Sequence, residues 1–123
     1  MTEVKKVLIV DDEPDIVKTL EFRIRKAGYQ AIVAVNGKEG LDKASEEKPD
    51  LILLDYRLPI MNGIEVFRKL QDDEKLKDIP VVFLTASSGS EEVKKLLEGA
   101  GAKHILIKPY EPEELLTKVQ ELI

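Results

Sequence analysis

The 123-residue chain has no cysteine, no tryptophan and a single histidine. The absence of cysteine excludes disulfide bonds and thiolate metal sites. No uninterrupted apolar run approaches the roughly 20 residues that a membrane-spanning helix needs. The N-terminal stretch MTEVKK is not followed by the extended apolar region of a signal peptide. We therefore expect a cytoplasmic protein that makes no membrane contact.

Basic residues are also fewer than acidic residues. Lysine and arginine number 19 against 24 aspartates and glutamates, which gives a net charge of −5. Because a nucleic-acid ligand requires a positive surface, we predict that nucleic acid is not a direct partner of this chain. Apolar residues at 43% and charged residues at 35% are typical of a globular fold. The length predicts one domain over residues 1–123.

Five short apolar runs, rich in β-branched residues, are spread along the chain. Runs this short with apolar residues on both faces predict strands buried on both sides, which is the pattern of a parallel sheet. The runs are VLIV at 7–10, AIVAV at 31–35, LILL at 51–54, VVFL at 81–84 and HILI at 104–107.

Apolar residues at helical spacing lie between these runs and after the last one. Ser88 and Glu91 have the spacing of a capping box, and Pro112 suits the first turn of the last helix. The predicted buried positions are Ile16, Val17, Leu20, Ile24 and Ala27; Leu41 and Ala44 in a less apolar segment, 38–47; Ile64, Phe67 and Leu70; Val93, Leu96, Leu97 and Ala100; and Leu115, Leu116, Val119, Leu122 and Ile123. The alternation predicts an α/β fold of the (βα)₅ type, a three-layer sandwich with helices on both faces of the sheet.

Polar side chains follow four of the five runs. Asp11 and Asp12 follow the first, Asp55 the third, Thr85 the fourth and Lys108 the fifth. Ligands of an open parallel sheet bind beyond the carboxyl ends of its strands, so these residues are predicted to share one edge. Each residue taken alone also suits an ordinary turn, strand end or surface. The ordinary interpretations fail together, because all of these residues would then have to meet by chance at a single edge of the sheet.

The chemistry open to these groups is limited. Three carboxylates without cysteine or histidine favour a hard cation such as Mg²⁺. A lysine can hold phosphate oxygens, and a threonine hydroxyl can donate one more hydrogen bond. A carboxylate can attack phosphorus and form an aspartyl phosphate. The residues therefore indicate Mg²⁺-dependent phosphoryl transfer.

Over its whole length the chain resembles the receiver domain of two-component response regulators. The stretches that carry the resemblance are IVDDEP, LILLDYRLPIMNG, VVFLTA and ILIKPY, in this order and spacing. The resemblance implies a flavodoxin-like sheet of order 2-1-3-4-5. It also implies a signalling switch, not a classical enzyme, that assists its own phosphorylation and dephosphorylation. Asp55 would take the phosphoryl group from a histidine kinase or a histidine phosphotransfer protein.

The resemblance also implies a role for each site residue. Asp12 matches a direct Mg²⁺ ligand and Asp11 a partner that often acts through water, and the phosphoacceptor itself completes the carboxylate set. The backbone carbonyl of Arg57 is implied as a further ligand, with its side chain facing the pocket. Thr85 matches the hydroxyl that responds to phosphorylation, and Lys108 the lysine that pairs with the phosphoryl group.

Further positions match or depart from the family pattern. Gly63 matches a glycine after the third strand, and the Lys108–Pro109 bond is expected to be cis. The family usually has Tyr or Phe where Ile105 stands, while Tyr110 matches a separate aromatic position. The face formed by the fourth helix, fifth strand and fifth helix is implied to bind an effector or output domain. A phosphorylation-dependent homodimer is a further candidate partner.

Three alternative functions compete with this interpretation. A phosphatase of the haloacid dehalogenase type needs a second acid where Arg57 stands. A flavin carrier needs a phosphate-binding loop where DDEP follows the first run, and carboxylates would repel that phosphate. A pseudo-receiver that is never phosphorylated stays open.

The remaining polar residues are expected to face water. Glu13 is predicted to be solvated or to cap the helix that follows it. The lysine pair at 94–95 and the acidic triplet at 72–74 are predicted to lie on solvated helix faces. No functional role is predicted for His104.

Overall fold

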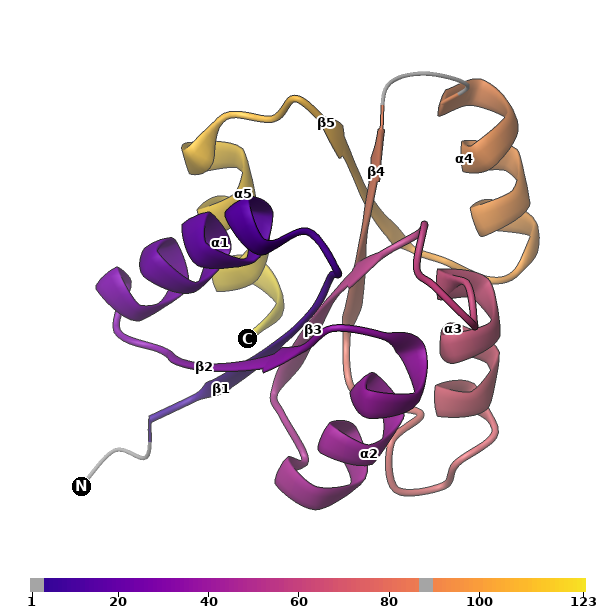
Figure 1. Ribbon diagram of the computed structural model, residues 1–123, viewed down its shortest axis with the longest axis horizontal. Coiled ribbons are helices and arrows are strands. Elements are labelled where there is room, and N and C mark those ends of the chain that lie inside the picture. Colours follow the sequence, from indigo (N-terminus) through magenta and orange to yellow (C-terminus); the bar gives the residue numbers. More distant parts are fainter. Residues whose placement is uncertain (1–3, 87–89) are drawn as a thin grey trace.

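The computed structural model describes residues 4–86 and 90–123 (Figure 1). The strands are β1 (Lys6–Val10), β2 (Gln30–Ala34), β3 (Leu51–Asp55), β4 (Val81–Ala86) and β5 (His104–Lys108). The helices are α1 (Pro14–Lys26), α2 (Gly37–Glu47), α3 (Gly63–Gln71), α4 (Ser90–Gly99) and α5 (Pro112–Leu122). The predicted alternation of strand and helix is confirmed.

All strand pairs are parallel, and the order across the sheet is β2-β1-β3-β4-β5. Helices α1 and α5 cover one face, and α2, α3 and α4 cover the other (Figure 1). Both the predicted fold class and the predicted strand order are therefore confirmed. Within the described residues, no helix combines the length and apolar character needed to cross a membrane.

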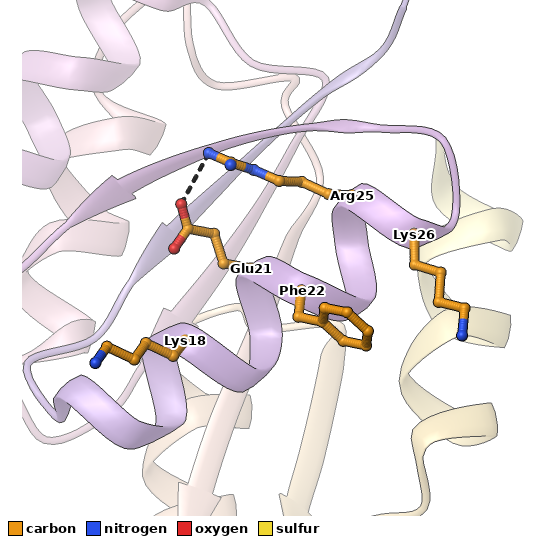
Figure 2. Close-up of a pocket in the computed structure, with 5 residues that line it drawn as sticks. All are labelled: Lys18, Glu21, Phe22, Arg25 and Lys26. Atoms are coloured by element: carbon orange, nitrogen blue, oxygen red, sulfur yellow. Dashed lines mark hydrogen bonds and ion pairs between the residues drawn. The ribbon is translucent and has the colours of Figure 1, made fainter.

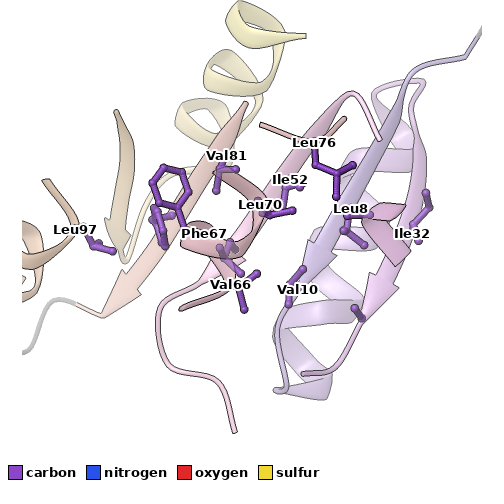
Figure 3. Packing of buried hydrophobic residues seen from close by; sticks show 14 residues of the cluster. Leu8, Val10, Ile32, Ile52, Val66, Phe67, Leu70, Leu76, Val81 and Leu97 are labelled. Atoms are coloured by element: carbon purple, nitrogen blue, oxygen red, sulfur yellow. The ribbon is translucent and has the colours of Figure 1, made fainter. Parts of the chain in front are cut away.

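Each strand supplies side chains to two separate cores. Alternate residues of β1 show this, because Val7 and Ile9 join the cluster under α1 and α5, whereas Leu8 and Val10 join the cluster under α2, α3 and α4. Figure 3 shows the second cluster, in which Leu8 and Val10 belong to the same packed layer as residues of α3 and β4. Full burial of such a side chain contributes roughly 1.5–3 kcal/mol, so the two cores fix the sheet between its helical layers.

Helix starts follow from local hydrogen bonding. The side chain of Asn36 accepts a hydrogen bond from the backbone N–H of Glu39 at 2.8 Å, and Asn62 accepts one from Glu65 at 3.0 Å. Glu13 is exposed at the start of α1 and makes no capping hydrogen bond through its side chain, so it is solvated as predicted. The predicted capping box at Ser88 lies outside the described residues.

The strand ends differ from the prediction by one or two residues. Strand β2 stops at Ala34, and Val35 is 47% exposed. Strands β3, β4 and β5 continue through Asp55, Thr85 and Lys108, which were expected to follow the strands. The sheet hydrogen bonding therefore holds these three site residues in extended backbone.

Three helical predictions were wrong in detail. Ala27 is the exposed C-cap of α1 and belongs to no buried stripe. Leu96 is 55% exposed, because α4 turns Leu97 toward the sheet in its place. The acidic triplet at 72–74 lies at the end of α3 and in the turn beyond it, where its first residue is the helix C-cap. The lysines at 94–95 are exposed on α4, as predicted.

Candidate functional site

Three strand ends place charged side chains at one edge of the sheet. Asp11 directly follows β1, and its backbone N–H donates to the carbonyl of Ala34 at 3.1 Å, which extends the β1–β2 ladder by one bond. Asp55 is the last residue of β3 and Lys108 the last of β5. Because the strands are parallel, these ends meet at the same edge.

Asp11 is fully buried. Its Oδ1 accepts a hydrogen bond from the backbone N–H of Glu13 at 3.0 Å. Its Oδ2 has no hydrogen-bond partner within the part of the chain that the structure describes, and the nearest cation, Lys108 Nζ, lies 3.8 Å away. Burial is the main cause that raises the pKa of Asp11. A buried carboxylate oxygen without a partner favours a bound cation.

Asp55 is 5% exposed, and its Oδ1 lies 3.9 Å from Lys108 Nζ. Burial, followed by repulsion from Asp11, raises the pKa of Asp55 to about 6. The ammonium of Lys108 and the backbone N–H of Arg57 act in the opposite direction. The Asp55 carboxyl is consequently ionised at neutral pH, and its charge is poorly solvated.

The site has more negative than positive charge. Asp12 is exposed beside the two buried carboxylates, and Lys108 is the ammonium that faces them. Both Lys108 distances exceed hydrogen-bond length, so the ammonium interacts with Asp11 and Asp55 through charge alone. A cation placed among the carboxylates would remove the imbalance.

The carboxylates fit a small divalent ion. Asp11, Asp12 and Asp55 each offer one oxygen, and these three atoms lie within 4.8 Å of one another. Octahedral Mg²⁺ with ligands at about 2.1 Å spaces adjacent and opposite ligands about 3–4 Å apart, close to this arrangement. The orphaned Oδ2 of Asp11 is a further argument for a cation here. The residues present therefore suit the Mg²⁺ expected from the sequence.

The other predicted site residues lie nearby. Thr85 is buried near the end of β4, one residue beyond Leu84, which pairs with Asp55 in the sheet register. The side chain of Arg57 is exposed two residues after Asp55. The structure thus brings Asp11, Asp12, Asp55 and Lys108 together. The roles of the Arg57 carbonyl and the Thr85 hydroxyl stay predictions.

Gly63 permits a close approach beside the site. A Cβ at this position would lie 2.7 Å from the carbonyl oxygen of Asp55 and 3.2 Å from the ring of Phe83. The Gly63 N–H donates to the Tyr56 carbonyl at 2.8 Å, which ties α3 to the end of β3. A side chain at position 63 would push this segment away from Asp55.

Comparison with known proteins agrees with the fold and with the acidic site. The family model of the response regulator receiver domain matches residues 7–120. The chain belongs to this family. It is 41% identical to the alkaline phosphatase synthesis transcriptional regulatory protein PhoP of Bacillus subtilis, with 97% of this chain and 48% of PhoP covered. It is 38% identical to the phosphate regulon transcriptional regulatory protein PhoB of Pseudomonas aeruginosa, with 97% and 52% covered.

Solved receiver structures superpose closely on this receiver domain. The chemotaxis protein CheY4 of Vibrio cholerae matches with a TM-score of 0.89 and 32% identity, over 98% of this chain and all of that one. The receiver domain of sensor histidine kinase PA1611 of Pseudomonas aeruginosa, with magnesium coordinated in its active site cleft, matches with a TM-score of 0.88 and 28% identity over 98% of both chains. The family match and the solved structures thus agree that this chain is a receiver domain.

The comparisons leave the nucleic-acid prediction without support. The receiver chain spans about half the length of the curated regulators it matches. Those proteins are named as transcriptional regulators, and a further relative, MtrA of Mycolicibacterium smegmatis, as a DNA-binding response regulator. The absence of a nucleic-acid partner therefore stays a prediction for this chain.

Strand β5 and the residues that follow it carry both an expected and an unusual feature of the receiver. The Lys108–Pro109 peptide bond is cis, as expected. Ile105 is half-buried opposite Phe83 in the sheet and packs against the cluster under α2, α3 and α4. Tyr110 packs against the other cluster, and burial raises the pKa of its hydroxyl. Position 105 is thus occupied by a packed aliphatic side chain.

Sequence reasoning missed Ile60 in the loop between β3 and α3. This residue has a φ of 73° and is 87% exposed. The backbone N–H of Met61 donates across it to the carbonyl of Pro59 at 2.7 Å. A β-branched residue is rarely left-handed, so its side chain gives no signal for this conformation.

A second missed feature lies on the outer face of α1 (Figure 2). An open hollow of about 560 Å³ surrounds Phe22, which is 64% exposed, with Lys26 Nζ 5.6 Å from its ring centroid. Arg25 pairs with Glu21 at 2.9 Å on the same helix. The signal was present in the sequence, because Phe22 falls outside the buried stripe of Val17, Leu20 and Ile24.

Proposed function

We propose that this receiver is a phosphorylation-dependent switch of a two-component system, with Asp55 as the phosphoacceptor. The observation that carries the proposal is the Asp55 carboxylate, buried at the sheet edge between Lys108 and the acidic pair Asp11 and Asp12. The donor is the phosphohistidine of a histidine kinase or a histidine phosphotransfer protein. That assignment rests on the family.

The proposed transfer is a single displacement at phosphorus. A carboxylate oxygen of Asp55 forms the new O–P bond while the P–N bond of the phosphohistidine breaks, and the electron pair leaves with the imidazole nitrogen, which is then protonated. Because the pKa of Asp55 is about 6, its carboxyl is ionised and nucleophilic at neutral pH. Lys108 Nζ, 3.9 Å from Asp55 Oδ1, is placed to hold a phosphoryl oxygen.

Mg²⁺ would be held by Asp11, Asp12, Asp55 and the backbone carbonyl of Arg57, and it would supply positive charge to the phosphoryl oxygens. The protein's own contribution is positioning. The β1 and β3 ends fix the two buried carboxylates, and β5 fixes the ammonium opposite them. Such positioning and charge are most of what catalysis of phosphoryl transfer requires.

The proposed output follows from the added charge. A phosphoryl group brings roughly −1.5 to −2 charges to a buried edge. Lys108 and the hydroxyl of Thr85 are the groups placed to respond to it. The α4-β5-α5 face carries exposed apolar residues, Leu96 and Ile107, that suit a protein partner. We assign this face to an effector, an output domain or a phosphorylation-dependent homodimer.

The proposal is tested by measuring the mass of the intact chain after incubation with Mg²⁺ and acetyl phosphate. The wild type should gain one phosphoryl mass, Asp55→Asn should gain none, and the exposed control Asp72→Asn should gain as much as the wild type. A gain that persists in Asp55→Asn refutes the phosphoacceptor. No gain in the wild type, under conditions that label CheY4 of Vibrio cholerae, favours a pseudo-receiver.

The output is tested separately by gel filtration with and without beryllofluoride, a phosphoryl mimic. A shift to the dimer with the mimic supports the homodimer. An unchanged elution volume assigns the α4-β5-α5 face to a different protein partner.

A further inference from the structure

A cavity of about 300 Å³ lies at the edge of the sheet opposite Asp55. It is built where β4 and β5 begin and where α3 and α5 end. Its lining residues are Phe67, Gln71, Lys77, Asp78, Ile79, Pro80, Val81, Gly101, Lys103, His104 and Leu122. Neither the proposed phosphorylation nor the metal site uses any of them.

Apolar residues form about half of the wall of this distal cavity, and polar residues form the rest. Phe67 and Val81 lie side by side in the core view (Figure 3), and Ile79, Pro80 and Leu122 complete the apolar lining. The ring of Phe67 already makes an edge-to-face contact with Phe83, with centroids 5.3 Å apart, so it is held in place from behind. An apolar wall containing a fixed aromatic ring suits a flat, apolar ligand body.

The charged groups that line the distal cavity are two lysines and one aspartate. Lys77 and Lys103 contribute two positive charges, and Asp78 contributes one negative charge. Lys77 is paired with Glu74 at 3.0 Å, which leaves Lys103 as the stronger attraction for an anion.

His104 adds a neutral hydrogen-bonding group to the same cavity. Burial, together with the positive charges of Lys118 and Lys103, lowers its pKa, while Glu121 acts the other way. The imidazole is therefore neutral at physiological pH and offers one donor and one acceptor.

We propose that the distal cavity is a binding site for a small planar aromatic monocarboxylate. The apolar walls take the ring, with Phe67 as an aromatic contact, and the carboxylate lies at the rim near Lys103 and His104. A single negative charge can pair with Lys103, whereas a second would be opposed by Asp78. The volume lies at the lower end of the range of ligand pockets and limits the ligand to one or two rings.

Binding can be measured with 2-naphthoate by NMR of the imidazole, because His104 is the only histidine of the chain. We expect a saturable shift of the His104 ring signals, with a Kd in the millimolar range or tighter. The uncharged analogue 2-naphthalenemethanol should bind about tenfold more weakly, a ratio typical of losing one charge contact. No saturable shift, or equal affinity for the alcohol, overturns the proposal.

Two variants locate the site on the chain. Lys103→Glu should weaken 2-naphthoate by about five- to tenfold. Lys94→Glu on α4 changes the net charge equally and should leave the affinity unchanged. Gln71→Trp removes the 3.3 Å hydrogen bond from Gln71 Nε2 to the Lys77 carbonyl and places an indole over the rim. It should abolish the shift while the far-ultraviolet circular dichroism stays that of the wild type. Equal loss in both lysine variants, or undiminished binding to Gln71→Trp, overturns the assignment to this cavity.

Discussion

Asp55 should destabilise the metal-free fold, and its replacement by asparagine should stabilise it. The carboxyl is 5% exposed, and its pKa rises from the ordinary 3.8 to about 6 on folding. At about 1.4 kcal/mol per pH unit, this difference corresponds to a penalty of about 3 kcal/mol for the ionised carboxylate. The asparagine variant has no ionisable group at this position and escapes the penalty.

The direction of the Asp55 pKa shift determines the pH range in which the substitution changes stability. Because the folded state binds the proton more tightly than the unfolded state, the free energy of unfolding falls as pH rises from about 4 to about 6 and then levels off. Asp55→Asn should therefore be nearly neutral at pH 4. At pH 7.5 it should raise the free energy of unfolding by up to about 3 kcal/mol.

Urea unfolding in EDTA at both pH values measures the effect. The exposed control Glu46→Gln should change the free energy of unfolding by less than about 0.5 kcal/mol at either pH. A stabilisation by Asp55→Asn that is equally large at pH 4 would show that desolvation of the carboxylate is not its cause. A variant that is no more stable than the wild type at pH 7.5 would refute the reasoning.

Three further substitutions test individual contacts. Gly63→Ala places a methyl 2.7 Å from the Asp55 carbonyl oxygen and should lower the free energy of unfolding by about 1–3 kcal/mol, whereas equal stability in urea would contradict this. Lys108→Ala removes a cation that lowers the pKa of Asp55, so this pKa should rise above about 6 in a ¹³C carboxyl titration without Mg²⁺; an unchanged pKa would count against the contact. Asn36→Ala removes the 2.8 Å hydrogen bond that caps α2 and should lower the free energy of unfolding by about 1 kcal/mol. Asn36→Asp should retain most of the stability that this cap provides.

The sheet and its functional edge could be predicted from the sequence because short-range patterns determine them. An apolar run such as LILL at 51–54 suits a strand covered on both faces, as in a parallel sheet between two helical layers. Parallel strands then bring their carboxyl ends to one edge, so Asp11, Asp55 and Lys108 converge without further information. Exact strand ends were less certain, since hydrogen bonds between neighbouring strands decide how far each one continues.

Other features depended on three-dimensional packing. The rotation of α4 about its axis decides whether Leu96 or Leu97 meets the sheet, and both suit the same apolar stripe. The left-handed turn at Ile60 is imposed by the loop that joins Asp55 to α3, against the preference of its side chain. The distal cavity is formed by the ends of several elements, so no single segment of the sequence indicates it.

The charge balance at the sheet edge connects stability with the proposed switch. Three carboxylates around one ammonium leave two negative charges in excess, which one divalent cation neutralises. In the proposed mechanism, phosphorylation replaces the single charge of Asp55 by roughly −1.5 to −2, so a negative excess returns even with the cation bound. In this mechanism, Lys108 and the Thr85 hydroxyl are then the groups that can interact with the added negative charge. Since Ile105 is a packed aliphatic residue without a ring, the proposed switch cannot reach the α4-β5-α5 face through a ring rotation at position 105.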